Sequence, residues 1–119
     1  MAQRDAGGDV ERIRRGDLWT VTLEAFPKPR PALVVSIDPL NDLRPEVVVV
    51  PITTRPGPLR VEMPDAPAMT GLRERSYVKC ESLGPLHESQ MKARIGQLPR
   101  SAWPAIEAGL CRVLGIRVE

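Results

Sequence analysis

The chain has 119 residues, which suits one domain that buries its own hydrophobic core. Its formal net charge is only +2, so the large basic surface of many nucleic-acid-binding proteins is not expected. The longest apolar run, EVVVVPI, is far too short to cross a membrane, and charged residues stand where a signal peptide would have its apolar segment. We therefore expect a soluble, cytoplasmic protein.

Metal and disulfide chemistry have little support in the composition. The chain has two cysteines, Cys80 and Cys111, without the spacing of a metal-binding pair, and its single histidine is His87. We therefore expect two free thiols in a reducing compartment, no metal site and no cofactor.

Short apolar segments with the alternation of β-strands make up most of the chain. The sequence has 13 prolines, about twice the average usage, and they separate these segments rather than mark disorder. Residues 1–13 have no apolar period and are predicted to be a disordered tail, so that 14–119 form the domain. The predicted strands cover residues 16–23, 32–37, 47–54, 58–63 and 76–83.

The connections and the end of the chain complete the prediction. Residues 38–46 and 64–75 are expected to be loops, and 87–98 a short helical turn followed by a short strand. In 58–63, Leu59, Val61 and Met63 are expected to point inward. Apolar residues then recur at helical spacing, so a C-terminal helix is predicted, with Ser101 as its N-cap and Gly115 as its end. The fold class is α+β: a mainly antiparallel β domain closed by one helix.

Two strand ends have side chains that suit an anionic group. Arg30 stands between prolines at the start of one predicted strand, and Thr53 lies at the end of the next. Adjacent antiparallel strands bring these two ends together. A guanidinium offers paired donors and a threonine hydroxyl adds one more, which is an arrangement that binds phosphate. Exposed arginines and strand-end threonines are also common without any function, so both interpretations stay open.

Other candidates are less well placed by the sequence. His87 is the usual residue for acid–base work, but it stands in a polar turn that favours a surface position. Glu24, Glu81 and Glu88 are possible general bases, and nothing in the sequence assigns one of them to a site. Phe26, in the loop before Arg30, is the aromatic residue best placed to contact a nucleobase.

The order of these segments resembles that of the MazF/PemK family of toxins. The similar segments are RRGDLWTVTL, RPALVVSID, VVVVPITT, LRVEM, GLRERSYVKCESL, IGQL and VLGI, in that order, over about residues 14–116. The resemblance implies an SH3-like antiparallel β-barrel with a C-terminal helix and short helical insertions. It also implies a homodimer that cleaves single-stranded RNA without a metal and is inhibited by an antitoxin with an acidic tail.

The resemblance also implies roles for particular residues. Arg30 and Thr53 match the catalytic positions of the family. RNA contacts are implied for a wider set, namely Phe26, Lys28, Thr54, Arg55, Glu81 and Ser82. The sequence departs from the family pattern at two places in this set. The loop EAFPKPRP is shorter than in many relatives. Many relatives also have an acid-Gln pair followed by an arginine, whereas this chain has Glu81-Ser82 and has Gly84 at the position of that arginine.

Three functions are compatible with this pattern. The first is a sequence-selective endoribonuclease toxin that leaves 2′,3′-cyclic phosphate and 5′-hydroxyl ends. The second is a non-catalytic, CcdB-like toxin that binds DNA gyrase through the C-terminal helix. The third is an inactive SH3-like interaction module, which the departures at Glu81–Gly84 would suit.

Overall fold

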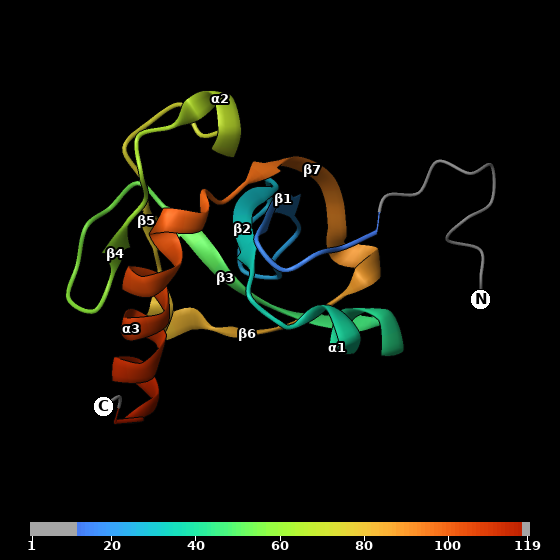
Figure 1. The fold of residues 1–119 in the computed structure, drawn as a ribbon. Helices are drawn as coiled ribbons and strands as arrows, with labels where there is room; N and C mark the ends of the chain where they lie inside the picture. Colours follow the sequence, from blue (N-terminus) through green and yellow to red (C-terminus); the bar gives the residue numbers. More distant parts are fainter. Residues whose placement is uncertain (1–11, 118–119) are drawn as a thin grey trace.

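The computed structural model describes residues 12–117. Seven strands run in chain order through this part of the protein (Figure 1): β1 Asp17–Val21, β2 Arg30–Val34, β3 Glu46–Thr53, β4 Val61–Glu62, β5 Tyr77–Val78, β6 Gly84–His87 and β7 Met91–Gln97. The helices are α1 Asp38–Leu43, α2 Pro67–Thr70 and α3 Trp103–Leu114, and three 3₁₀ turns are η2 Cys80–Ser82, η3 Glu88–Gln90 and η4 Arg100–Ala102.

The strands form one antiparallel sheet in the order β4-β5-β3-β2-β1-β7, with β6 also paired to β3. The strand β3 is the centre of this sheet and changes partner along its length. Its first half, from Glu46 to Val49, pairs with β6, and its last two residues, Ile52 and Thr53, pair with β5. Pro51, which has no N–H to donate, lies between these two paired segments. The predicted antiparallel fold with a C-terminal helix is confirmed, although the hydrogen-bonded sheet is not closed into a barrel.

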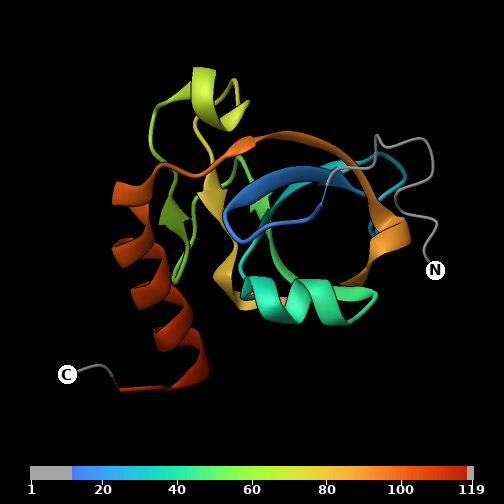
Figure 2. The same ribbon diagram turned by 45° about the vertical axis from the view of Figure 1, so that its right-hand side comes forward.

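The alternation of side chains along the strands divides the core into two clusters. In β2, Leu33 faces one cluster, whereas Ala32 and Val34 face the other. One cluster is enclosed by the curled strands β1, β2, β3 and β7 (Figure 2), and the other lies between the sheet and α3. Both faces of β2 are therefore buried, as its continuous apolar sequence predicts.

The motif Arg-Gly-Asp at the start of β1 has a structural role. Asp17 is 1% exposed, and its carboxylate accepts hydrogen bonds from the Arg14 backbone N–H (2.9 Å) and the Trp19 indole N–H (3.3 Å). The Arg94 guanidinium of β7 lies 3.7 Å from its other oxygen. A buried carboxylate with these partners holds the first turn of the domain against β7.

Helix α3 ends as predicted but begins differently. Gly115 ends it in the left-handed conformation at a φ of 71°, where glycine has no Cβ penalty. The N-cap residue is Ala102, without a side-chain cap, so the prediction of Ser101 as the cap is wrong. The turn η4 contains Ser101, and Pro104 in the first helical turn needs no backbone acceptor.

Two predicted strands are shorter in the structure than in the sequence analysis. In 58–63 only β4 is extended, because residues 58–59 form a turn with Leu59 at a positive φ of 70°. Leu59 is exposed, so the prediction that it points inward is wrong, whereas Met63 is buried. In 76–83 the strand β5 is followed by η2, which turns the chain towards β6.

The structure also adds elements that the sequence analysis treated as loops. Helix α1 lies within the predicted loop 38–46, and its Asn41 is buried. The Asn41 amide oxygen accepts a hydrogen bond from the Ser36 hydroxyl (2.5 Å), and its amide nitrogen donates one to the Ser36 carbonyl (3.1 Å). Helix α2 lies within the predicted loop 64–75. The turn and strand predicted within 87–98 are confirmed as η3 and β7.

The N-terminal boundary of the domain lies earlier than residue 14. Ile13, which the sequence analysis placed in the tail, is buried in the cluster between the curled strands, and Arg12 forms an ion pair with Asp42 at 2.7 Å. Residues 1–11 of the predicted tail, and 118–119 at the other end, lie outside the described residues. No helix within 12–117 is long and apolar enough to span a bilayer.

Candidate functional site

Arg30 and Thr53 are set against each other by the register of the sheet. Ala32 of β2 pairs with Pro51 of β3, and the same register continued by two residues puts Arg30 opposite Thr53. The formal pairing stops at Ala32 because Pro31 has no N–H to continue the ladder. Directly opposite residues in antiparallel strands have Cβ atoms about 4.5–5.5 Å apart. Continued in this way beyond its last formal pair, the register sets the two strand ends that the sequence analysis singled out opposite each other.

The Thr53 hydroxyl is oriented by its own loop. Its Oγ1 accepts a hydrogen bond from the Arg55 backbone N–H at 3.2 Å. This contact uses a lone pair and leaves the hydroxyl proton, which has no acceptor among residues 12–117. The side chain is half-buried at the end of β3. Thr53 is thus prepared to donate a hydrogen bond to a group outside the protein.

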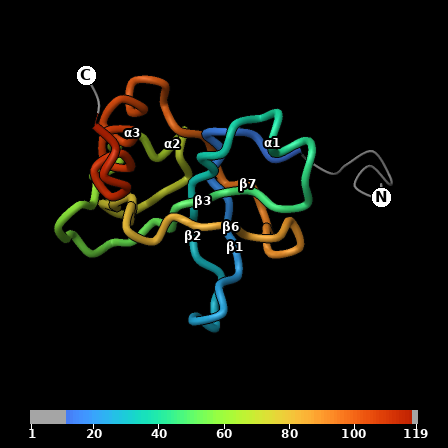
Figure 3. The backbone as a smooth tube through the Cα atoms, turned by 90° about the horizontal axis from the view of Figure 1, so that it is seen from below, coloured from blue at the N-terminus to red at the C-terminus, as the bar shows by residue number. Residues whose placement is uncertain are grey.

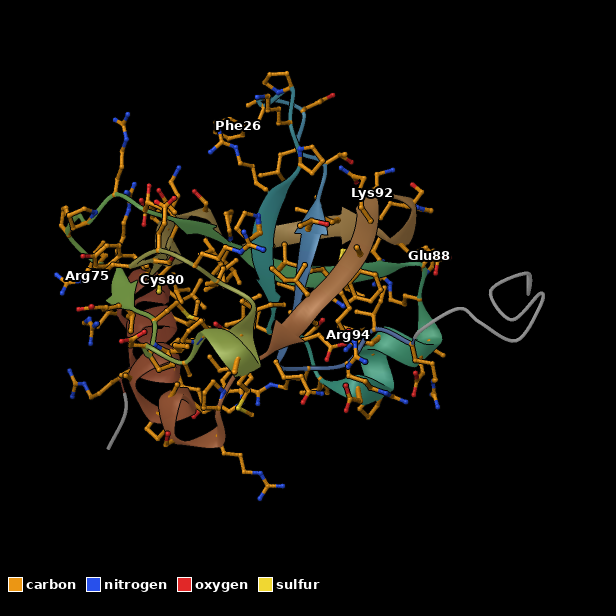
Figure 4. All side chains as sticks on the ribbon, turned by 90° about the horizontal axis from the view of Figure 1, so that it is seen from above. Phe26, Arg75, Cys80, Glu88, Lys92 and Arg94 are labelled. Carbon is orange, nitrogen blue, oxygen red and sulfur yellow. The ribbon has the colours of Figure 1, made fainter. Side chains whose placement is uncertain are left out.

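Arg30 is held by an aromatic ring rather than by a carboxylate. Its guanidinium carbon lies 4.5 Å from the centroid of the Phe26 ring, a cation–π contact typically worth about 0.5–1 kcal/mol at an exposed site. No carboxylate within residues 12–117 forms an ion pair with it, so its donors remain available. The loop between β1 and β2 stands away from the rest of the molecule (Figure 3), with Phe26 on it (Figure 4).

A second arginine fixes the loop that follows Thr53. Arg60 donates from Nη1 to the Arg55 carbonyl at 3.0 Å, and from Nε and Nη2 to one oxygen of Glu81 at 2.9 and 2.7 Å. These hydrogen bonds lower the pKa of the Glu81 carboxyl, although partial burial opposes the shift. Arg60 therefore ties the loop 54–60 to η2.

The loop 54–60 is packed closely against this arginine. A Cβ on Gly57 would lie 3.3 Å from Cδ and Nε of Arg60, which is tight. The Arg60 side chain is only 19% exposed, so most of it is shielded from solvent. We name the set Arg55, Arg60 and Glu81 the Arg60 clamp.

The remaining predicted RNA contacts lie around these two strand ends. Lys28 is exposed on the β1–β2 loop, Thr54 and Arg55 are exposed directly after β3, and Ser82 is half-buried in η2. Glu81 is engaged by Arg60, so in this structure its carboxylate has a partner within the protein. Contact of these residues with RNA stays a prediction.

Two of the candidate bases lie away from Arg30 and Thr53. His87 pairs with Glu46 at the opposite end of β3 from Thr53, and its Nδ1 accepts the Ser89 backbone N–H at 3.0 Å. Glu88 follows it there and donates its backbone N–H to the Pro45 carbonyl. Glu24 lies in the β1–β2 loop with Phe26 and is exposed.

Sequence reasoning missed two residues near Thr53. Arg60 lies within the predicted strand 58–63, where its alternation with the apolar residues Leu59 and Val61 predicts only an outward-facing side chain. Tyr77 was placed in a strand without a role, but β5 sets it directly opposite Thr53. Knowledge of which strands are neighbours would have been needed to find either residue.

No group of three His, Cys, Asp or Glu side chains in 12–117 is arranged to hold a metal ion.

The comparison with protein families agrees with the segment order. Residues 14–114 match the PemK-like, MazF-like toxins of type II toxin–antitoxin systems. Because this match spans most of the chain, the protein belongs to that toxin family.

Similar solved structures support the same fold. A mycobacterial endoribonuclease in complex with its cognate antitoxin is similar with a TM-score of 0.76 at 23% identity, over 92% of this chain and 99% of that chain. The Mycobacterium tuberculosis toxin MazF-mt6 has a TM-score of 0.74 at 23% identity, over 86% and 99%. A MazE–MazF complex from Deinococcus radiodurans has a TM-score of 0.72 at 20% identity, over 90% and 99%.

Proposed function

We propose that this protein is a metal-independent endoribonuclease that cleaves single-stranded RNA at short sequences. The opposition of Arg30 and Thr53 at the ends of β2 and β3 carries this proposal. One side chain is a cation without a carboxylate partner within 12–117, and the other is a hydroxyl whose proton can be donated. Together they form a receptor for a phosphodiester group.

The reaction that this receptor suits is an internal transesterification. The 2′-hydroxyl oxygen of one nucleotide forms a bond to the adjacent phosphorus, and the bond from phosphorus to the 5′ oxygen of the next nucleotide breaks. The 2′-hydroxyl loses its proton and the departing 5′ oxygen gains one. The products are a 2′,3′-cyclic phosphate and a 5′-hydroxyl end.

Arg30 and Thr53 would act on the charge that develops on the phosphoryl oxygens. A guanidinium donates two hydrogen bonds to one phosphate, and a positioned donor of this kind typically contributes about 10²–10³ in rate. The general base is not assigned, because a guanidinium is too weak an acid to serve as one at neutral pH.

The biological role follows from the family and from the relatives. We propose that the protein is the toxin of a type II toxin–antitoxin pair, acts as a homodimer on mRNA in the cytoplasm, and is inhibited by an antitoxin with an acidic tail. The exposed basic residues of this region, namely Lys28, Arg30 and Arg55, suit such a tail as well as RNA.

The test is RNA cleavage in the presence of EDTA. Purified protein is incubated with a long single-stranded RNA, and fragments are resolved on a gel. We expect discrete fragments with the wild type and at least a hundredfold slower cleavage with Arg30→Ala. Arg44→Ala is the matched control, because Arg44 is an exposed arginine that pairs with Glu46 at the other end of β3.

Two results would contradict the proposal. One is the absence of cleavage when the wild-type protein is in molar excess over RNA. If gyrase is then recovered from the cell as a bound partner, the CcdB-like alternative is favoured. The other is equal cleavage by Arg30→Ala and the wild type, which would show that the cleavage does not depend on Arg30.

A further inference from the structure

We propose that Tyr77 is a substrate-binding residue, whose hydroxyl donates a hydrogen bond to the RNA phosphate backbone beside the bond that is cleaved. This inference rests on the proposed function, since it extends the same site by one strand. Its starting observation is the pairing of Tyr77 in β5 directly opposite Thr53 in β3.

The direction of the Tyr77 side chain follows from its neighbour. Val78 is fully buried in the cluster under α3, and successive side chains of a strand point to opposite faces. Ile52, the partner of Val78, belongs to the same cluster. Tyr77 and Thr53 therefore share the other face of the sheet, where α3 does not cover them.

The register extends this arrangement into a row across the sheet. Thr53 of β3, Tyr77 of β5 and Glu62 of β4 follow one another as cross-strand neighbours. The register of β2 with β3, continued by two residues beyond its last pair, adds Arg30 at the other end of this row. Neighbours in such a row have Cβ atoms about 4.5–5.5 Å apart. A bound RNA backbone can thus contact several members of the row.

The Tyr77 hydroxyl has no hydrogen-bond partner among residues 12–117. The residue is half-buried, and a buried tyrosine hydroxyl usually finds a partner. In Tyr77 the hydroxyl has no such partner within the described part of the chain, so it is free to donate to another molecule. The chain has one tyrosine, so this phenol has no counterpart elsewhere in the sequence.

The charge at the end of the row does not oppose an anion at Tyr77. Glu62 pairs with Arg75, whose Nε lies 3.3 Å from its carboxylate. Glu62 and Arg75 together add no net charge. The donors Arg30, Thr53 and Tyr77 thus form a continuous row that favours a phosphate backbone.

The direct test compares Tyr77→Phe with the wild type. This substitution removes the hydroxyl and keeps the ring, so the fold is retained. We expect the single-turnover rate of fragment formation in EDTA to fall about tenfold, with an unchanged fragment pattern and an unchanged thermal midpoint. Tyr77→Ala, which removes the ring as well, should lose little more activity than Tyr77→Phe where the protein remains folded.

A reduction of less than threefold in Tyr77→Phe would overturn the inference, as would a larger reduction that is accompanied by a lower thermal midpoint. The wild type and Arg30→Ala are measured alongside. If the wild type cleaves, Arg30→Ala does not, and Tyr77→Phe matches the wild type, then only the role of Tyr77 fails. If the wild type does not cleave, the proposed function itself fails.

A second measurement separates direct contact from an indirect effect. Because Tyr77 is the single tyrosine, acetylation of the phenol by N-acetylimidazole reports on this residue alone. In the Thr53→Val variant, which is expected to bind RNA but cleave it slowly, saturating single-stranded RNA should reduce acetylation several-fold. Acetylation that RNA leaves unchanged would rule out the contact.

Discussion

Thr53 is the residue whose environment most directly defines the site. Its oxygen accepts the Arg55 N–H, and its proton has no acceptor among residues 12–117, so the hydroxyl is free to donate to a bound group. We expect Thr53→Val to slow RNA cleavage by about a hundredfold, because valine has a similar shape but no donor. The measurement is the single-turnover rate in EDTA.

Thr53→Ser is the matched control for this prediction. Serine keeps the hydroxyl and its acceptor role towards the Arg55 N–H, so most of the activity should remain. Equal rates for Thr53→Val and the wild type would remove Thr53 from the reaction.

At the level of residues, the sequence predicted the strand-end pair but not its surroundings. Arg30 and Thr53 could be paired in advance because antiparallel neighbours join the start of one strand to the end of the next. Phe26 was predicted to contact a base, and in the structure its ring lies against Arg30. The partner of Glu81 could not be predicted, since Arg60 is 21 residues away and the contact depends on the fold.

The Arg60 clamp is the element-scale feature that holds the loop after β3. The pKa of Glu81 is lower in the folded protein than in the unfolded chain. The ion pair between Glu81 and Arg60 therefore contributes fully to stability above the ordinary glutamate pKa of about 4.3. It is lost as the pH falls through the lower pKa of the folded protein. The pair is partly exposed, so solvent screening limits this contribution to a few tenths of a kcal/mol.

We therefore predict a small, pH-dependent effect of Glu81→Gln. The variant should lose about 0.5 kcal/mol of unfolding free energy at pH 7, and the difference should shrink as the pH falls below about 4. Cleavage should slow several-fold because the loop beside Thr53 loosens. Urea unfolding at several pH values measures the first effect, and the EDTA assay measures the second.

Glu46→Gln is the control for the clamp. Glu46 also pairs with an arginine, Arg44, but at the far end of β3. Its substitution should leave cleavage unchanged. A stability difference for Glu81→Gln that keeps its full size at pH 3.5 would show that the ion pair is not its cause.

Helix α3 approaches β4 and η2 closely at Gly109. A Cβ there would lie 2.6 Å from Cγ2 of Val61 and 3.0 Å from Sγ of Cys80, in the buried cluster under the helix. Helix propensity alone would make Gly109→Ala stabilising by about 1 kcal/mol. We expect instead a net loss of about 1–3 kcal/mol from overpacking.

Urea unfolding of Gly109→Ala measures this balance. Gly115→Ala provides a comparison of a different kind, because nothing lies within 4 Å of a Cβ there and only the positive φ of 71° opposes the substitution. A stabilised Gly109→Ala protein would contradict the close approach of α3 to β4 and η2.

At the level of elements, long patterns were predicted well and short ones were not. Strands with a continuous valine-rich or alternating sequence, such as β1 to β3, and the period of α3 were found in advance. Helix α1 was missed because its stability comes from the buried pair Ser36 and Asn41, which has no apolar period. Strand β6, with proline and glycine, forms through its pairing with β3 rather than through its own propensity.

The charge of the whole molecule limits how the proposed RNA substrate can be bound. The net charge of +2 gives little long-range attraction to a polyanion, so the proposed RNA binding depends on local groups. The fold gathers such groups where β2 begins, β3 ends and β5 begins, on the face that α3 leaves uncovered. The sequence could predict the class of fold and the strand ends that meet, but the row that continues from Thr53 to Tyr77 depends on the full strand order.

The chemistry of the RNA ends tests the central claim most directly. In the proposed reaction, which needs no metal, Arg30 and Thr53 support attack by the 2′-hydroxyl on the adjacent phosphorus. Fragments produced by the wild-type protein in EDTA should therefore have a 2′,3′-cyclic phosphate at one end and a 5′-hydroxyl at the other. The 5′ ends should accept phosphate from polynucleotide kinase without prior phosphatase treatment. Fragments with 5′-phosphate and 3′-hydroxyl ends would instead require attack by water, and would contradict this account.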